Sequence, residues 1–319
     1  MSVSLLNINN LSVSFKTDKG PIKVVSDLSF DIKKSEVFGL VGESGCGKSL
    51  TALSILRILP NNAFSEGAIL FNNKNLLTLN DEEMRRMRGK DISMIFQEPM
   101  TSLNPVLTVG YQIAEALVTH FEISKKEAMD RTVELLRAVK IPSPEVRIKD
   151  YPHQMSGGMR QRVMIAMAIA CNPSLLIADE PTTALDVTIQ AQILELLQGL
   201  RKERQMAVLL ITHDLSIISE QADRVAIMYA GRIMELADVY ELFQKPLHPY
   251  THGLLESLPV AKGIALKPIA GFVPPPEKFP GGCKFSDRCY LSSDMCKAKE
   301  PELIEVSKNH FVRCIKIRQ

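Results

Sequence analysis

The sequence GESGCGKS, at residues 42–49, is the stretch of this chain that decides its fold. It follows an apolar run at residues 36–41 and precedes residues 49–59, where apolar side chains recur at helical spacing. A glycine-rich loop that ends in Lys-Ser between a strand and a helix fits the P-loop pattern. Its backbone amides can wrap phosphates, and the helix N-terminus adds partial positive charge. The stretch therefore predicts a nucleotide phosphate site.

Two side chains of this loop have specific predicted roles. Lys48 is expected to reach the β- and γ-phosphates, and the Ser49 hydroxyl to ligate Mg²⁺. The alternative, a glycine-rich turn with a surface lysine, is disfavoured by the flanking strand and helix. The predicted nucleotide-binding residues of the loop are Gly42, Glu43, Ser44, Gly45, Cys46, Gly47, Lys48 and Ser49.

A pair of carboxylates follows a second apolar run, at residues 175–178. Asp179 is suited to hold Mg²⁺ through water, and Glu180 to polarise the attacking water as general base. Asp-Glu after a strand is common in proteins. The P-loop upstream is what favours a catalytic role here.

The flanking sequence predicts an α/β protein. Strand-like runs separated by Gly20-Pro21 predict an antiparallel β-edge, and helical periodicity from about residue 100 to 171 predicts an inserted helical subdomain, interrupted at residues 142–152. Alternating strands and helices imply a largely parallel sheet covered on both faces. Strands are predicted at residues 3–15, 22–32, 36–41, 91–96, 175–178, 207–212 and 224–228, and helices at 49–59, 81–90 and 187–204.

Composition excludes several classes of protein. Lys and Arg number 38 against 36 Asp and Glu, a balance that gives no electrostatic footprint for nucleic acid. No apolar run reaches the roughly 18 residues that a membrane helix requires, and residues 1–10 lack the pattern of a signal peptide. A cytosolic location is expected.

The tail after residue 244 differs from the rest of the chain. It is rich in proline, has little periodicity, and carries Cys283, Cys289, Cys296 and Cys314. We assign residues 1–244 to the nucleotide-binding domain and residues 245–319 to a small C-terminal extension. In a reducing cytosol, such a cysteine cluster indicates metal binding before disulfides.

Residues 155–161, MSGGMRQ, lie about twenty residues before Asp179 and resemble the signature motif of the ABC ATPase family. The resemblance extends over residues 3–244, and the ordered set of motifs is more specific than any one of them. Met159 departs from the family, which most often has Gln there. The resemblance implies that Ser156, Gly157 and Gly158 bind the ATP held by the P-loop of another subunit.

Further roles follow from the same resemblance. Phe15 matches the aromatic residue that stacks on adenine, although a Phe in an alternating strand is more often core. Gln97 resembles the Q-loop glutamine that senses Mg²⁺ and the γ-phosphate, and an exposed glutamine is the alternative. Residues 183–186 resemble the D-loop, and Asp186 lies at the end of this stretch. The resemblance implies that the loop crosses to the partner subunit. His213 matches the switch histidine at the γ-phosphate, and a helix cap is its alternative.

Residues 97–105, QEPMTSLNP, and the tail resemble the ATPases of peptide and nickel importers. This implies an ATP-hydrolysing subunit that powers import of di- or oligopeptides, with nickel or another small solute as the alternative. The implied partners are two membrane permeases, a second ATPase subunit or another copy of this chain, and an extracytoplasmic binding protein reached through the permeases. The implied location is the cytoplasmic face of the inner membrane.

The sequence disfavours two other classes of function. A soluble ABC ATPase of DNA repair or translation usually has a coiled-coil insertion or two cassettes, and this chain has neither. A regulatory module without turnover is disfavoured because Lys48, Asp179, Glu180 and His213 are all present.

Four thiolates can complete a [4Fe–4S] cluster or a tetrahedral zinc site. The cysteine spacing does not resemble paired zinc knuckles, and the C-terminal extension that this tail resembles can hold a four-iron cluster. We therefore expect a [4Fe–4S] cluster, with zinc and unliganded or reversibly oxidised thiols as alternatives.

Overall fold

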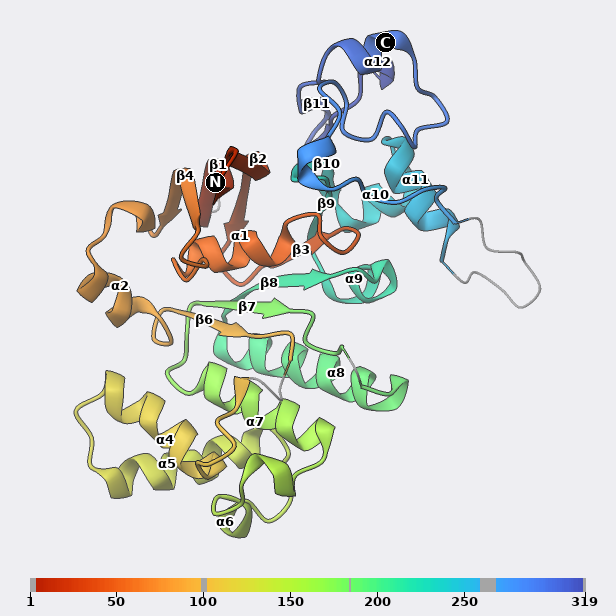
Figure 1. Cartoon of the computed structure of the whole chain (residues 1–319). Coiled ribbons are helices and arrows are strands. Elements are labelled where there is room, and N and C mark those ends of the chain that lie inside the picture. The colour runs from red at the N-terminus through yellow and green to blue at the C-terminus, as the bar shows by residue number, and fades with distance from the viewer. Residues whose placement is uncertain (1–3, 99–101, 184, 259–267, 318–319) are drawn as a thin grey trace. The chain divides into compact units, whose positions relative to one another are not determined.

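The computed structural model describes residues 4–98, 102–183, 185–258 and 268–317 (Figure 1). The chain forms two compact units, which are described separately. The first comprises Met1–Thr78 and Leu210–Gln319, and the second Leu79–Leu209. Strand β8 (Ala207–Thr212) begins in the second unit and ends in the first. None of the described helices combines the length and apolar character that crossing a bilayer requires.

An antiparallel sheet forms the predicted β-edge of the first unit. Its strands lie in the order β2-β1-β4-β5. The prediction found the first two strands but not the other two, which begin beyond the P-loop helix. The strands are β1 (Ser4–Thr17), β2 (Gly20–Lys33), β4 (Ala63–Phe71) and β5 (Lys74–Asn75).

A second set of strands in the first unit carries the P-loop. Strand β3 (Val37–Val41) is parallel to β9 (Arg224–Tyr229), as predicted. Beyond β9 the pairing is antiparallel, an end of the sheet that the sequence analysis did not predict. From β9 the order continues through β10 (Arg232–Asp238), β12 (His310–Val312) and β11 (Ile304–Ser307).

The antiparallel pairing of β9 and β10 has a local cause. Ala230 and Gly231 connect the strands with φ of 45° and 77°. Two residues of positive φ make the tight turn whose twist matches a hairpin. The tail then contributes β12, which pairs with β10 through Glu235 opposite Val312.

The P-loop helix α1 (Lys48–Ile55) ends four residues before the predicted Leu59. Arg57 has φ of 52°, a left-handed conformation that stops a helix. The other helices of the first unit are α9 (Leu215–Gln221), α10 (Val239–Gln244), α11 (Pro249–Glu256) and α12 (Asp294–Ala298), with short 3₁₀ turns at Leu76–Thr78, Pro276–Lys278 and Ile315–Ile317.

In the second unit, strand β6 (Ile92–Ile95) is parallel to β7 (Leu175–Asp179). Polar N-cap side chains begin several helices, as at Thr108, Ser124 and Ser156. The predicted helical insertion is confirmed, and its irregular part contains α6 and a 3₁₀ turn, Pro152–Gln154. The helices are α2 (Asp81–Met87), α4 (Val109–His120), α5 (Lys125–Ala138), α6 (Pro144–Arg147), α7 (Gly157–Ile169) and α8 (Val187–Arg204).

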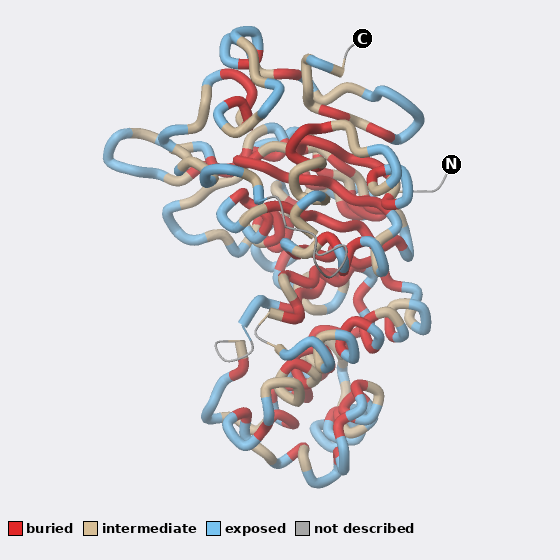
Figure 2. Tube along the Cα trace, turned by 90° about the vertical axis from the view of Figure 1, so that its right-hand side faces the viewer, coloured by how far each residue is buried: buried red, intermediate tan, exposed pale blue. Residues whose placement is uncertain are grey.

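The central strands are buried along their whole length. Every residue of β3, β6, β7, β8 and β9 is buried, and red, buried segments run through both units in Figure 2. Strands covered on both faces read as continuous apolar runs. This burial explains why these strands were visible in the sequence.

Candidate active site

The predicted phosphate loop follows β3 directly and ends at α1. A Cβ atom at Gly42 would lie 2.1 Å from the carbonyl oxygen of Met228, so only glycine fits there. Gly47, the N-cap of α1, has φ of 104°, which favours glycine. Ser44 and Gly45 are exposed at the tip, and Ser49 is exposed in the first helical turn. The loop thus has the strand–loop–helix geometry that the sequence predicts.

The Lys48 side chain folds back onto the phosphate loop. Its side chain is buried, and Nζ donates to the carbonyl oxygens of Gly42 at 2.7 Å and Glu43 at 3.1 Å. Cys46 is also buried, and burial raises the pKa of its thiol. The Cys46 thiol therefore stays protonated and packs inside the loop. It does not serve as a nucleophile.

The predicted catalytic carboxylate lies at the end of β7. Asp179 is the last residue of that strand and is buried, and Glu180 follows with φ of 46°. Glu180 Oε2 accepts hydrogen bonds from Gln97 Nε2 at 3.1 Å and Thr183 Oγ1 at 2.9 Å. Non-glycine residues are uncommon in this conformation. The second unit thus brings Gln97 to the predicted general base.

The remaining predicted contacts to nucleotide and Mg²⁺ are distributed over both units. Ser49 belongs to the first unit, and Gln97 and Asp179 to the second. Phe15 is half-buried on β1, and His213 is exposed directly after β8. Their roles as adenine contact and γ-phosphate switch stay predictions.

The predicted signature residues form the start of α7. Ser156 is the N-cap, and its hydroxyl accepts a hydrogen bond from the Met159 amide at 3.3 Å. Gly157 and Gly158 open the helix, and a Cβ at Gly158 would come within 2.9 Å of the Ile189 side chain. Because position 159 contributes its backbone amide to the cap, the change from the family's Gln leaves this cap intact.

Asp186 is the N-cap of α8, and its carboxylate accepts from the Ile189 amide at 2.9 Å. Parts of the two predicted loops, residue 184 of the D-loop and residues 99–101 of the Q-loop, lie outside the described residues.

Two residues of the tail that the sequence analysis missed contact the phosphate loop. The Glu43 carboxylate accepts from Arg288 Nη1 at 2.8 and 3.1 Å, and the Glu43 amide donates to the Tyr250 hydroxyl at 3.1 Å. Arg288 and Glu43 are 245 residues apart. No local pattern could have linked them, although the tail itself was visible as a separate segment.

The four tail cysteines line one small cavity of about 10 Å³. Burial raises the pKa of Cys283 to about 11, and also raises the pKa of Cys289 and Cys314, with the neighbouring thiols adding to the effect. The cysteines therefore lie near one another. Yet among the described residues no group of three or more His, Cys, Asp or Glu side chains is placed to hold a metal ion. The predicted set of cluster ligands is therefore not assembled in this structure.

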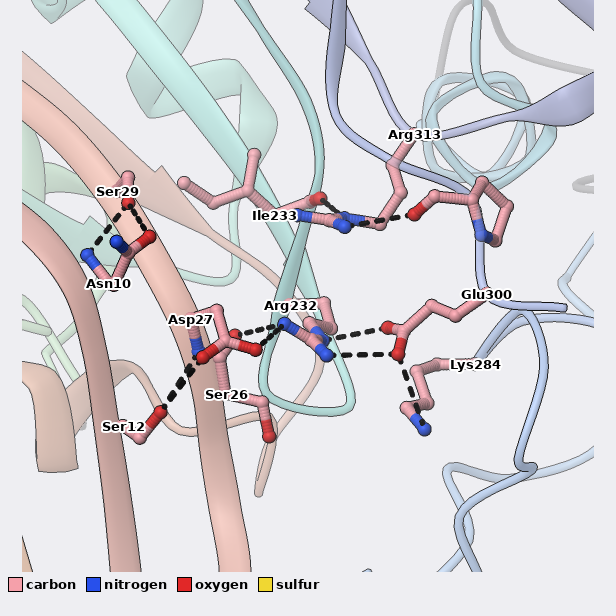
Figure 3. Close-up of polar contacts among 11 residues, drawn as sticks. Asn10, Ser12, Ser26, Asp27, Ser29, Arg232, Ile233, Lys284, Glu300 and Arg313 are labelled. Carbon is pink, nitrogen blue, oxygen red and sulfur yellow. Dashed lines mark hydrogen bonds and ion pairs between the residues drawn. The ribbon is translucent and has the colours of Figure 1, made fainter. Parts of the chain in front are cut away.

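A larger cavity, of about 670 Å³, lies in the first unit beside β2 and β10. Charged groups on its wall pair with each other: Arg232 forms ion pairs with Asp27 and Glu300, both at 2.7 Å (Figure 3). Arg313 donates to the carbonyl oxygens of Ile233 and Pro301, both at 2.9 Å. These contacts anchor the tail to β2 and β10.

Comparison with known proteins identifies the family. A family model described as ABC transporter matches residues 25–183, and one described as oligopeptide/dipeptide transporter, C-terminal region, matches residues 234–296. The chain is 51% identical to the Bacillus subtilis oligopeptide transport ATP-binding protein AppD, over 98% of this chain and 96% of that protein. It is 50% identical to the Haemophilus influenzae dipeptide transport ATP-binding protein DppD, over 98% and 95%.

Solved structures agree with this result. A dimeric ATP-binding cassette, MJ0796, bound to ADP and Pi, superposes with a TM-score of 0.66 at 27% identity, covering 73% of this chain and 98% of that one. The structure of cbiO1 from Clostridium perfringens, part of the ABC transporter complex cbiONQ, has a TM-score of 0.64 at 27% identity, covering 76% and 91%. With the phosphate loop, the carboxylates and the signature helix in the predicted order, the chain belongs to the ABC transporter ATPase family.

Proposed function

We propose that this ATPase powers the import of di- or oligopeptides through a membrane transporter. The observation that carries the proposal is similarity along the whole chain to peptide transport ATP-binding proteins, together with the match of residues 234–296 to the oligopeptide/dipeptide C-terminal region. The relatives named above are transport proteins, so they give no support to a role in DNA repair or translation.

The proposed chemistry gives each predicted site residue a role. The loop amides and Lys48 bind the phosphates, while Ser49 and Asp179 hold Mg²⁺. Glu180 orients the attacking water, and Gln97, its hydrogen-bond partner, reports the presence of Mg²⁺ and the γ-phosphate. His213 contacts the γ-phosphate, and Phe15 stacks on adenine.

A second ATPase subunit completes each site in this proposal. Ser156, Gly157 and Gly158 offer a helix N-terminus, where amides and the helix dipole favour a phosphate. The solved cassette that resembles this chain is described as a dimer with ADP and Pi. Asp186, the N-cap of α8, is proposed to cross to the partner subunit. The partner is a second copy or a related chain.

The proposed partners are two membrane permeases, with a binding protein outside the membrane delivering substrate to them. The chain would then sit on the cytoplasmic face of the inner membrane. The test is to purify the permeases with this chain and reconstitute them in proteoliposomes with the binding protein. Peptide uptake that requires ATP, and ATP hydrolysis stimulated by peptide, are expected. Stimulation by nickel in place of peptide would instead support the alternative solute, and assembly with no permease would overturn the proposal.

We also propose that Cys283, Cys289, Cys296 and Cys314 bind a [4Fe–4S] cluster. Their shared cavity supports this, although the thiols would have to move because about 10 Å³ holds no more than a water molecule. Chain purified without oxygen should contain about four irons and four acid-labile sulfides, and Cys289→Ser should lose them. Stoichiometric zinc would replace the cluster assignment, and protein without metal would leave free or oxidised thiols.

A further inference from the structure

Glu43 is a residue of the phosphate loop that the C-terminal extension contacts directly. Its carboxylate accepts from Arg288 and its amide donates to the Tyr250 hydroxyl, as described above. Its carbonyl oxygen accepts from Lys48 Nζ at 3.1 Å. Two of these three contacts come from the extension, and the third leads to the lysine that closes the loop.

Packing fixes both contacting side chains. The Arg288 side chain is only 6% exposed, and its guanidinium lies 5.6 Å from the ring centre of Tyr229 and 6.0 Å from that of Phe285. Tyr250 is fully buried, with its ring 4.8 Å from that of Tyr229. Cation–π contacts and edge-on aromatic packing hold these groups in one geometry.

We propose that Arg288 and Tyr250 are positioning residues for ATP binding: they hold Glu43, and through it the phosphate loop and Lys48, in the shape that receives the phosphates. This inference rests on the proposed role of residues 42–49 in nucleotide binding. A glycine-rich loop has many accessible conformations. If only some of these conformations bind phosphate, the apparent affinity for ATP is the intrinsic affinity multiplied by the fraction of molecules whose loop has a binding conformation. Fixing Glu43 from outside the loop raises that fraction.

The main test compares ATP binding by the whole chain before and after Arg288→Gln, with a fluorescent ATP analogue as the probe. Loss of a buried, charged contact is expected to weaken binding about five- to tenfold. Arg288→Lys should restore part of the affinity because the charge returns without the fork of the guanidinium. In the transporter assembled with its permeases, the KM for ATP should rise while kcat at saturating ATP stays near that of the parent.

A double-mutant cycle isolates the contact itself. Glu43→Gln should weaken binding as much as Arg288→Gln, and the double variant should be no worse than either single one. Additive losses would show that the two residues act separately, which overturns the proposal. Tyr250→Phe keeps the buried ring but removes the hydroxyl, so it tests the same idea if Arg288→Gln does not fold.

Arg313 provides a matched control within the same extension. It donates to the carbonyl oxygens of Ile233 and Pro301, not to the loop (Figure 3). Arg313→Gln should therefore leave ATP affinity within about twofold. An equal loss in this variant would mean that general loosening of the tail is responsible, and would refute a specific role for Arg288.

Lys48→Ala separates failure of this inference from failure of the proposed site. If Lys48→Ala weakens ATP binding and neither Arg288→Gln nor Tyr250→Phe does, only the positioning role is wrong. Unchanged binding in Lys48→Ala would remove the phosphate-loop assignment on which the inference rests.

Discussion

Gln97 Nε2 donates a hydrogen bond of 3.1 Å to Oε2 of Glu180, across 83 residues of sequence. The first residue follows β6 and the second follows β7, and these two strands are parallel neighbours. The carboxyl ends of parallel strands lie at the same edge of a sheet, which is where α/β proteins place their ligands. The contact joins a residue that resembles a γ-phosphate sensor to the predicted general base.

Glu180→Gln is expected to bind ATP and to hydrolyse it about 10²- to 10⁴-fold more slowly. The amide preserves the size of the side chain and its contacts but cannot take a proton from water. Phosphate release by the assembled transporter measures the loss, and nucleotide binding to the chain checks that the site persists. Glu195→Gln, at an exposed position on α8, is the matched control and should turn over normally. Normal hydrolysis by an assembly that carries only Glu180→Gln would disprove the assignment.

Lys48→Ala is expected to weaken ATP binding by about 10- to 100-fold, since hydrogen bonds to charged groups contribute about 1.5–3 kcal/mol. Equilibrium binding of ATP to the purified chain measures this. Lys34→Ala removes an exposed lysine after β2 and should leave the affinity unchanged. The P-loop interpretation would not survive an unchanged affinity in Lys48→Ala.

The elements that the sequence predicted most accurately are strands that are buried along their whole length. Strands β3, β7 and β8 are buried throughout, so their apolar runs were plain. Strand β10 is also almost wholly buried, but the turn before it uses Ala230-Gly231 and lacks the Asn-Gly or Asp-Gly signal of a hairpin. The antiparallel end of the sheet was therefore missed.

Within the candidate site, motifs that are continuous in sequence were predictable and long-range contacts were not. The loop at residues 42–49 could be recognised because its function needs glycines and a lysine at fixed spacing. Arg288 contacts Glu43 because the tail packs beside β9 and β10, a result of tertiary structure. For the cysteines, the expectation of a cluster came from their number and spacing and from the resemblance of the tail, and neither determines whether four thiols meet at ligand distance.

Ser156→Arg is expected to leave ATP binding by the isolated chain intact and to abolish ATP-driven closure of the dimer. In the proposed composite site the serine serves the nucleotide of the other subunit, and arginine would fill that space. ATP-dependent dimerisation of the ATPase subunits, or turnover in the assembled transporter, reports closure. Ser124→Arg is the control, because Ser124 likewise caps a helix, through the Glu127 amide at 3.1 Å. Loss of ATP binding by the isolated Ser156→Arg chain would contradict the composite site.

His248 is expected to make the stability of the fold depend on pH. It is fully buried, and its Nδ1 accepts a hydrogen bond from the Tyr250 amide at 3.1 Å, which requires that nitrogen to be unprotonated. Burial lowers its pKa from 6.5 to about 4. Between these two values the unfolded chain binds a proton that the folded chain does not, so folding is destabilised as the pH falls.

His248→Asn should flatten this pH dependence. The parent is expected to lose on the order of 3 kcal/mol of unfolding free energy through this histidine as the pH falls from about 6.5 to about 4, because its pKa is 6.5 unfolded and about 4 folded. Asparagine keeps a side-chain acceptor for the Tyr250 amide but does not titrate. Urea unfolding at pH 7 and pH 5, followed by circular dichroism, measures the difference. The gap in stability between parent and variant should shift in favour of the variant at the lower pH. A gap that is the same at both pH values would show that His248 is not held neutral in the folded protein.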